Sequence, residues 1–165
     1  MLVWILVLAG FYGSDKECKC SEDAIKRYLG RISGPLLDRI DIQVEVSSVK
    51  YENFNSDVQE ESSKEIQKRV NMARNVQLKR YDGIGIYSNS ELTPSLIEKF
   101  CKLDNSGKYI LKQAFEKLGL SARAYESILK VARTIADLDE SKNILDKHLL
   151  EAIQYRSLDK KYYGR

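Results

Sequence analysis

The chain has 165 residues, of which 43% are hydrophobic and 31% charged, and its formal net charge is +3. This composition excludes an intrinsically disordered chain and is typical of a globular protein that buries a core. The mildly basic charge allows an anionic partner without requiring one. The three cysteines, an odd number, argue against a disulfide framework and predict a reducing, cytoplasmic location.

The first ten residues, MLVWILVLAG, are almost entirely apolar. A secretory signal or a lipoprotein anchor is the alternative interpretation of such a segment. However, no basic residue precedes the run, and Phe11 stands where a lipoprotein would need cysteine. The run is also about half the roughly 20 residues that a spanning helix needs. We therefore expect no membrane association.

A short helix is predicted next, at residues 24–29. Residues 32–37 have apolar side chains at helical spacing, and residues 41–46 alternate as a half-buried strand does. Because a single strand cannot satisfy its own backbone groups, it needs a partner, either at residues 84–87 or in a sheet further upstream. Residues 47–61 are rich in Ser, Asn, Asp and Glu, which predicts a linker.

The remainder of the chain is predicted to be helical. Ser62 and Glu65 have the spacing of a capping box, Pro94 suits the first position of a helix, and Gly119 suits a left-handed helix end. Each helix has an apolar stripe that another helix must cover, so a helical bundle is predicted. The expected helices cover residues 62–80, 94–103, 106–118, 121–138 and 141–157.

Arg39 and Arg123 are the two residues whose positions invite a functional interpretation. Arg39 follows an apolar helical turn, where a cation complements the helix dipole, so a purely structural role is the simpler alternative. Arg123 lies in the first turn of the helix predicted from Ser121, where a positive charge opposes the dipole. An anion bound beside the free N–H groups of that turn would explain it, although arginines near helix starts are common.

Five sequence blocks resemble consecutive segments of one family. They read RYLGRISGPLLDRIDIQVEV, ESSKEIQKRVNMAR, IYSNSELTPSLIEKFCKLD, LGLSARAYESILKVARTIADL and HLLEAIQYRSLD. In order and without large gaps, they are similar to the C-terminal end of the magnesium-chelatase-like AAA+ ATPases of the ComM/YifB competence family. The resemblance implies a mainly α fold. It consists of an AAA+ helical lid bundle at residues 62–165, preceded by the linker at residues 47–61 and a short remnant of the α/β ATPase core at residues 1–46.

The resemblance also implies a role for each arginine. Arg39, in GPLLDRID, falls on the family's arginine finger, which reaches into the neighbouring subunit and stabilises charge on the transferring γ-phosphate. Arg123, in LSAR, falls on the sensor-2 arginine of the lid, which touches the phosphates of the nucleotide. Guanidinium suits both roles because it stays protonated and offers a planar fork of donors to phosphate oxygens.

The departures from the family concern the rest of the ATP site. The phosphate loop G-x-x-x-x-G-K-[ST] does not occur in these 165 residues, nor does an apolar strand that ends in paired acids and would hold magnesium. ATP and Mg²⁺ are implied for the complete family protein. We expect this chain alone neither to bind them tightly nor to hydrolyse ATP. Its expected partners are further copies in a hexameric ring, or an upstream ATPase core.

Cys18 and Cys20 are the candidate metal ligands, because the family's Cys-Pro-Cys and its later Cys-x-Cys could together supply four thiolates for zinc. Only the second pair occurs here, and a structural zinc needs about four ligands, so no metal is expected. Cys101 is predicted to be a small buried residue. His148 is predicted to be a packing or surface residue in mid-helix, because no partner orients it for catalysis.

The apolar leader has a separate explanation. Residues 4–10, WILVLAG, can be written with codons that spell Met-Asp-Pro-Cys-Pro-Cys-Gly when the frame is shifted by one base. That heptapeptide is close to the motif that the family has at this place. We expect the leader to be an out-of-frame translation, which the nucleotide sequence of the gene would decide.

The resemblance implies DNA processing, namely branch migration of recombination intermediates. The C-terminal tail, YRSLDKKYYGR, mixes cations with tyrosines as single-stranded nucleic-acid-binding segments do, but a solvated terminus is the simpler alternative. Two other functions stay open. One alternative is a stand-alone helical module that binds DNA or a partner protein and does not hydrolyse ATP. The other is a subunit of a metal-chelatase motor.

Overall fold

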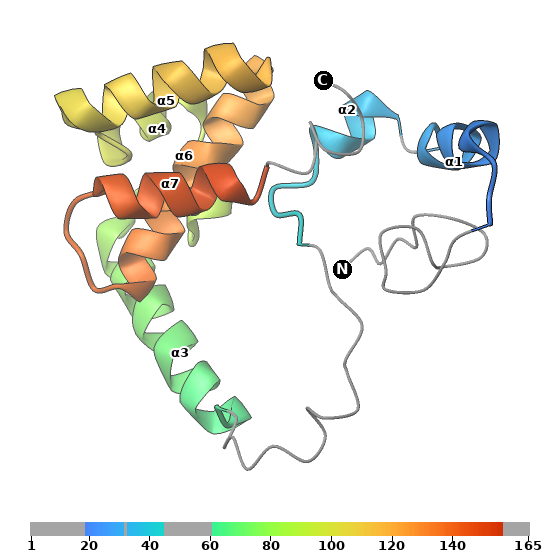
Figure 1. Ribbon diagram of the computed structural model, residues 1–165. Coiled ribbons are helices and arrows are strands. Elements are labelled where there is room, and N and C mark those ends of the chain that lie inside the picture. Colours follow the sequence, from blue (N-terminus) through green and yellow to red (C-terminus); the bar gives the residue numbers. More distant parts are fainter. Residues whose placement is uncertain (1–18, 32, 45–60, 157–165) are drawn as a thin grey trace.

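The computed structural model describes residues 19–31, 33–44 and 61–156, and all of its regular secondary structure in these residues is helical (Figure 1). No strand occurs in the described part of the chain. This agrees with the predicted lid bundle. The elements are α1 (Glu22–Leu29), α2 (Gly34–Leu37), α3 (Ser63–Arg80), the 3₁₀ helix η2 (Asn89–Glu91), α4 (Pro94–Phe100), α5 (Asn105–Leu118), α6 (Ala122–Leu138) and α7 (Asp146–Gln154).

Helix α6 is the central element of the bundle. It packs against α3, α4, η2 and α7, and α5 packs in turn against α7. Small residues on α6 allow these close approaches, since Ala124, Ala132 and Ala136 are at most 1% exposed. The larger members of the core come from α4, α5, α6 and α7, and include Ile97, Leu111, Ile128, Leu129 and Leu149.

Local side-chain signals fix several helix ends as predicted. The Ser62 hydroxyl accepts from the Glu65 N–H (3.3 Å), and the Glu65 carboxylate accepts from the Ser62 N–H (2.9 Å), which completes the capping box at the start of α3. Ser121 caps α6 in the same way, by accepting from the Ala124 N–H (3.1 Å). At the end of α5, Gly119 adopts the left-handed conformation with φ of 60°.

Several predicted helix ends are wrong, and α7, for example, ends at Gln154 rather than at residue 157. Helix α4 stops at Phe100 rather than at residue 103, because the chain must turn before Asp104, which caps α5 by accepting from the Gly107 N–H (2.8 Å). Helix α7 begins at Asp146 rather than at Ser141. The carbonyls of Ser141 and Lys142 accept instead from the buried guanidinium of Arg133 (2.7 and 2.9 Å), which holds this segment in a loop.

The predicted strand at residues 41–46 is also wrong where the structure describes it. Residues 41–44 are not paired in a ladder, and the suggested partner at residues 84–87 forms a turn and a short irregular stretch. One backbone bond, from the Gln43 N–H to the Tyr155 carbonyl (3.0 Å), connects the segment to the end of α7. Residues 45 and 46 lie outside the described residues, as do the leader, Cys18, residues 47–60 of the predicted linker and residues 157–165 of the tail.

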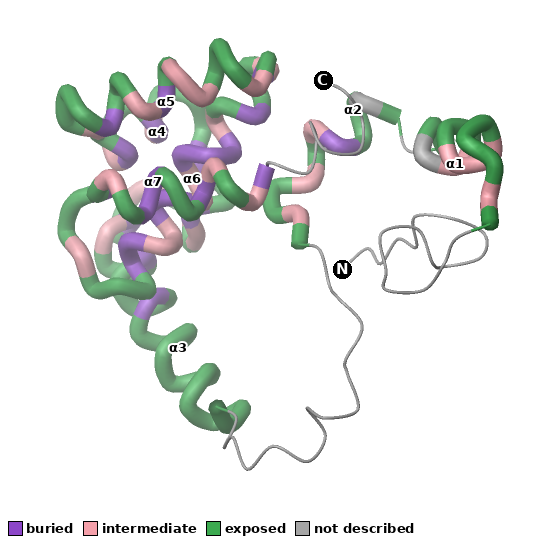
Figure 2. The backbone as a smooth tube through the Cα atoms, viewed as in Figure 1, coloured by how far each residue is buried: buried purple, intermediate pink, exposed green. Residues whose placement is uncertain are grey.

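Helix α3 projects from the bundle (Figure 1). Of its 18 residues only Ala73 and Gln77 are buried, and Figure 2 shows its N-terminal half exposed along its length. Ile66 and Val70 continue the same helix face but are 42% and 45% exposed, so no described residue covers them fully. None of the described helices combines the length and the apolar character that a membrane span requires.

Candidate functional site

Arg39 is the third residue of a four-residue turn, residues 37–40, that begins at the last residue of α2. The turn is closed by a hydrogen bond from the Ile40 N–H to the Leu37 carbonyl (3.0 Å). The Arg39 side chain is exposed, and no hydrogen bond or ion pair joins it to another described residue. No described residue therefore occupies its guanidinium, which is compatible with the predicted arginine finger.

The turn that carries Arg39 is held from its inner side by Arg156. The Arg156 guanidinium donates to the carbonyls of Ile40 and Leu37, the latter at 3.4 Å, and lies 3.6 Å from the Asp38 carboxylate. Arg156 is only 1% exposed. The expectation that it belongs to a basic tail facing solvent or nucleic acid is therefore wrong, because its charge is used inside the protein.

The chain downstream of Arg39 contacts the bundle at α6. The Ser127 hydroxyl donates to the Asp41 carboxylate, and the Gln43 N–H donates to Tyr155 as described above. Ser127 is buried, so this bond fixes the segment against the surface of α6. Sequence reasoning missed this contact because 86 residues separate its two partners.

Arg123 lies in the first turn of α6, as predicted. Its side chain is exposed and makes no hydrogen bond or ion pair with any other residue that the structure describes. It precedes Ser127 by four residues, which places the two on one helix face, about one turn apart. The structure therefore brings the Arg39 segment to the same end of α6 as Arg123, although the two guanidinium groups make no contact with each other among the described interactions.

A buried polar cluster, which sequence reasoning missed, joins α3 to α6. Asp137 is 1% exposed and accepts hydrogen bonds from Arg80, from Arg133 Nε (3.1 Å) and from Asn89 Nδ2 (2.9 Å). The hydrogen bonds that Arg80 donates to Asp137 raise the pKa of Arg80, whereas burial lowers the pKa of Arg133. The i, i+4 spacing of Arg133 and Asp137 within an apolar stripe is the sequence signal that could have found it.

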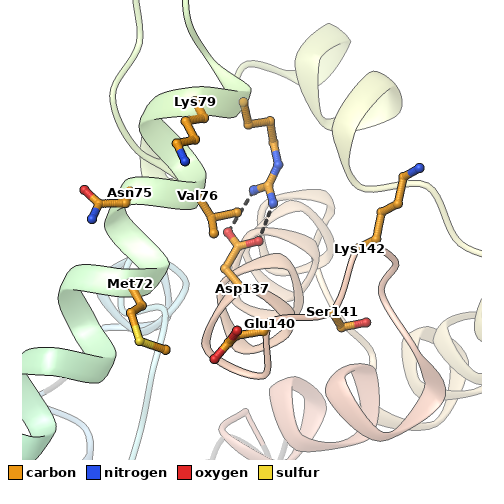
Figure 3. Close-up of a pocket in the computed structure, with 9 residues that line it drawn as sticks. Met72, Asn75, Val76, Lys79, Asp137, Glu140, Ser141 and Lys142 are labelled. Carbon is orange, nitrogen blue, oxygen red and sulfur yellow. Dashed lines mark hydrogen bonds and ion pairs between the residues drawn. The ribbon is translucent and has the colours of Figure 1, made fainter.

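A groove of about 560 Å³ lies beside this cluster, between α3 and the end of α6. Figure 3 shows Met72, Asn75, Val76 and Lys79 of α3 across from Asp137 and Glu140. Neither Arg39 nor Arg123 lines this groove. It is therefore separate from the residues that the sequence singled out.

His148 is a packing residue, as predicted, and it also caps α7. Its Nδ1 accepts from the Leu145 N–H (3.0 Å), so the neutral ring carries its proton on Nε2, which donates to the Asp139 carboxylate (3.0 Å). With both ring nitrogens occupied and 2% of the residue exposed, His148 has no free group for acid–base chemistry. It sits in the first turn of α7 rather than in mid-helix.

The two described cysteines differ in their surroundings. Cys101 is buried in the bundle core, as predicted, and burial raises the pKa of its thiol to about 11. Cys20 is partly buried just before α1. Within the described ranges no three His, Cys, Asp or Glu side chains come together as a set of metal ligands.

Two family models match this chain. Residues 60–156, which hold the bundle and Arg123, match magnesium chelatase, subunit ChlI C-terminal. The chain belongs to the magnesium chelatase ChlI family. A second model, magnesium chelatase, subunit ChlI, matches residues 7–54 of this family member, which include the turn with Arg39.

Curated relatives of this ChlI family member cover most of it. The competence protein ComM of Haemophilus influenzae is 41% identical over 141 residues, which are 85% of this chain and 27% of that protein. The protein YifB of Escherichia coli is 40% identical over 143 residues, or 86% of this chain and 28% of YifB. A protein of Mycobacterium tuberculosis is 31% identical over 123 residues. The chain thus spans about a quarter of the length of the relatives it matches and resembles a segment of ComM and YifB.

Proposed function

We propose that this chain is the C-terminal part of an ATP-dependent AAA+ motor of the ComM/YifB type, and that Arg39 and Arg123 act on a nucleotide held by other polypeptide. The observation that carries the proposal is the state of these two side chains. Both are exposed cations without an anionic partner among the described residues; Arg123 lies on α6, and the segment with Arg39 is attached to α6 through Asp41.

The position of Arg123 supports a phosphate ligand. A cation in the first turn of a helix is disfavoured by roughly 0.3 to 1 kcal/mol, because the helix N-terminus carries a partial positive charge. An anion offsets this cost by meeting both the guanidinium and the free N–H groups of the turn. Ser121 already satisfies the Ala124 N–H, so the remaining first-turn donors and Arg123 are available.

We further propose what the complete motor contains besides this chain. ATP and Mg²⁺ bind a core that these residues do not form, and the complete protein works as a ring, with Arg39 contacting the nucleotide of a neighbouring subunit. By resemblance to ComM, the client is branched DNA in recombination. The chain alone then has no ATPase activity.

A chimaera tests this proposal. In it, this chain replaces the 141 matching residues of Haemophilus influenzae ComM. We expect ATP turnover by the chimaera and none above background by the isolated chain. A chimaera that folds, assembles and does not hydrolyse ATP, or an isolated chain that does, would contradict the proposal.

A stand-alone binding module is the second candidate, and helix α3 favours it. The sequence of α3, SKEIQKRVNMARNVQLKR, contains six Lys and Arg against one Glu. Lys64, Lys68 and Lys79 are exposed along the projecting helix. Such a cationic stripe is complementary to nucleic-acid phosphates.

Binding of the isolated chain to single-stranded DNA, followed by fluorescence anisotropy at several salt concentrations, tests this candidate. If α3 is a DNA-binding surface, affinity falls steeply with salt, and K64E/K68E weakens binding while the matched change K108E/K112E on α5 does not. Binding that both double variants leave unchanged would contradict a role for α3.

A further inference from the structure

The inner side of the Arg39 turn is filled by one buried guanidinium. Arg156 donates to the carbonyls of Leu37 and Ile40, the first and last residues of the turn, and pairs with Asp38, the second. Arg39, the third residue, is the one member of the turn that Arg156 does not contact in these interactions. It is also the only exposed member of the turn, since Leu37 is buried and Asp38 and Ile40 are partly buried.

Because Arg156 is buried, its hydrogen bonds stabilise one backbone conformation of residues 37–40. A buried guanidinium is costly unless acceptors surround it, and Arg156 is 1% exposed. The carbonyls of Leu37 and Ile40 converge on it because the Ile40 N–H closes the turn at 3.0 Å. A chain that left this turn conformation would remove acceptors from a buried cation. Arg156 therefore favours the conformation that presents Arg39 outward.

A second attachment fixes the segment downstream of the turn. Ser127 donates to the Asp41 carboxylate, and the Gln43 N–H donates to the carbonyl of Tyr155, the neighbour of Arg156. Residues 37–43 are thus held by α6 and by the end of α7 together. Any movement of these two helices would carry Arg39 with it.

We propose that Arg156 is a positioning residue for Arg39, holding the arginine in a fixed orientation on the helical bundle. This inference rests on the proposed function of Arg39 as the arginine finger. Arg156 itself is buried, with 1% of the residue exposed, so it is not placed to meet a nucleotide directly. Its effect passes through the turn, so it changes the rate of the step that Arg39 assists rather than the affinity for nucleotide.

Hydrogen exchange of the 165-residue chain measures the structural part of the proposal. In Arg156→Ala the peptide over residues 38–44 should exchange about 10-fold faster or more, while peptides from α4 and α5 stay within about twofold. Arg74→Ala, which removes an exposed arginine from α3, is the matched control and should change neither. Unchanged exchange over residues 38–44 in Arg156→Ala would overturn the proposal.

Arg156→Lys keeps the test decisive if Arg156→Ala does not fold. Lysine retains the buried charge but offers one nitrogen in place of a fork, so it cannot bind both carbonyls and the carboxylate in the same geometry. We expect the bundle peptides to stay protected and residues 38–44 to lose protection. Full protection of residues 38–44 in the lysine variant would overturn the proposal.

Turnover in the ComM chimaera measures the functional part. Arg156→Ala should lower kcat about 10²-fold, as small misplacements of reacting groups do, with KM for ATP nearly unchanged. Arg39→Ala/Arg156→Ala should be no slower than Arg39→Ala alone, since both act through one group. If Arg39→Ala lowers kcat and Arg156→Ala does not, the positioning role of Arg156 is contradicted while the proposed function of Arg39 stands. If Arg39→Ala has no effect, the proposed function fails as well.

Discussion

Asp137 is the residue on which the link between α3 and α6 depends. Its side chain is fully buried, and two arginines with side-chain exposures of 16% and 3% pair with it. Asp137→Asn keeps the shape of the side chain but leaves both guanidinium groups facing a neutral amide that also carries donors. We expect a loss of about 3 to 5 kcal/mol in the free energy of unfolding, measured by urea denaturation.

The matched control for this prediction is an exposed ion pair. Lys112 and Glu116 on α5 lie 3.9 Å apart with side chains 71% and 55% exposed, so Glu116→Gln should cost less than about 0.5 kcal/mol. A loss below about 1 kcal/mol for Asp137→Asn would mean that the buried cluster tolerates a missing charge.

Sequence patterns identified Arg39 and Arg123 but not Arg156 or Asp137. The first two were found because a long run of neighbouring residues resembles a known family. Arg156 looked like part of a basic tail, and its true partners, Leu37 and Ile40, lie more than 110 residues away in the sequence. No local pattern reports a contact of that separation, since it exists only once the bundle has formed.

At the scale of elements, Gly119 sets the end of α5 and the direction in which α6 begins. Its φ is +60°, and a Cβ built there would meet nothing within 4 Å, so a substitution costs backbone strain without a steric clash. Gly119→Ala should lower the free energy of unfolding by about 1 to 2 kcal/mol.

Asparagine tolerates the left-handed conformation better than alanine does, so Gly119→Asn should cost clearly less than Gly119→Ala. The same urea titration measures both variants. Equal losses for the two would show that the cost does not come from the backbone conformation of this residue.

The start of α7 should depend on pH through Asp139. Lys147 (2.7 Å) and His148 (3.0 Å) hydrogen-bond this carboxylate and lower its pKa below the ordinary value of 3.8. Because the folded pKa is depressed, the stabilisation is complete above the unfolded pKa and is lost as pH falls through the folded pKa. Asp139→Asn should lower stability at pH 7 and flatten the loss of stability below about pH 4.

Thermal unfolding measured from pH 7 to pH 2 checks this prediction. Glu98→Gln changes an exposed carboxylate on α4 and should leave the melting temperature at pH 7 as it is. A pH profile of Asp139→Asn that parallels the unaltered protein would contradict a role for Asp139 in holding the start of α7.

The helices that could be predicted are those with a capping residue or a left-handed glycine at their ends. Ser62, Ser121 and Gly119 act on backbone groups within four residues, and α3, α6 and α5 begin or end where these residues indicate. The start of α7 could not be predicted in this way. Arg133, which lies on α6, donates hydrogen bonds to the carbonyls of Ser141 and Lys142, and these bonds hold the residues before α7 in a loop. The predicted strand was wrong at residues 41–44, the part that the structure describes, because alternation predicts a strand only where a neighbouring strand is available.

At the scale of the whole molecule, the bundle is a support for two exposed arginines. Its core fixes α6, α6 carries Arg123, and Ser127 and Arg156 attach the segment with Arg39 to the same support. We therefore expect the two arginines to matter for catalysis and hardly at all for folding. Their replacement should leave the melting temperature of the isolated chain within about 2 °C, since exposed substitutions seldom change stability by more than about 0.5 kcal/mol.

The steady-state rate of ATP hydrolysis by the ComM chimaera with Arg39→Ala/Arg123→Ala measures whether the two arginines act on the nucleotide, with Arg69→Ala/Arg74→Ala on α3 as the matched control. We expect the first pair to lower kcat about 10³-fold or more, as removal of a finger arginine does, and the control pair to leave it near the unaltered rate. If both chimaeras turn over ATP at the unaltered rate, these arginines do not serve the nucleotide and the account is contradicted.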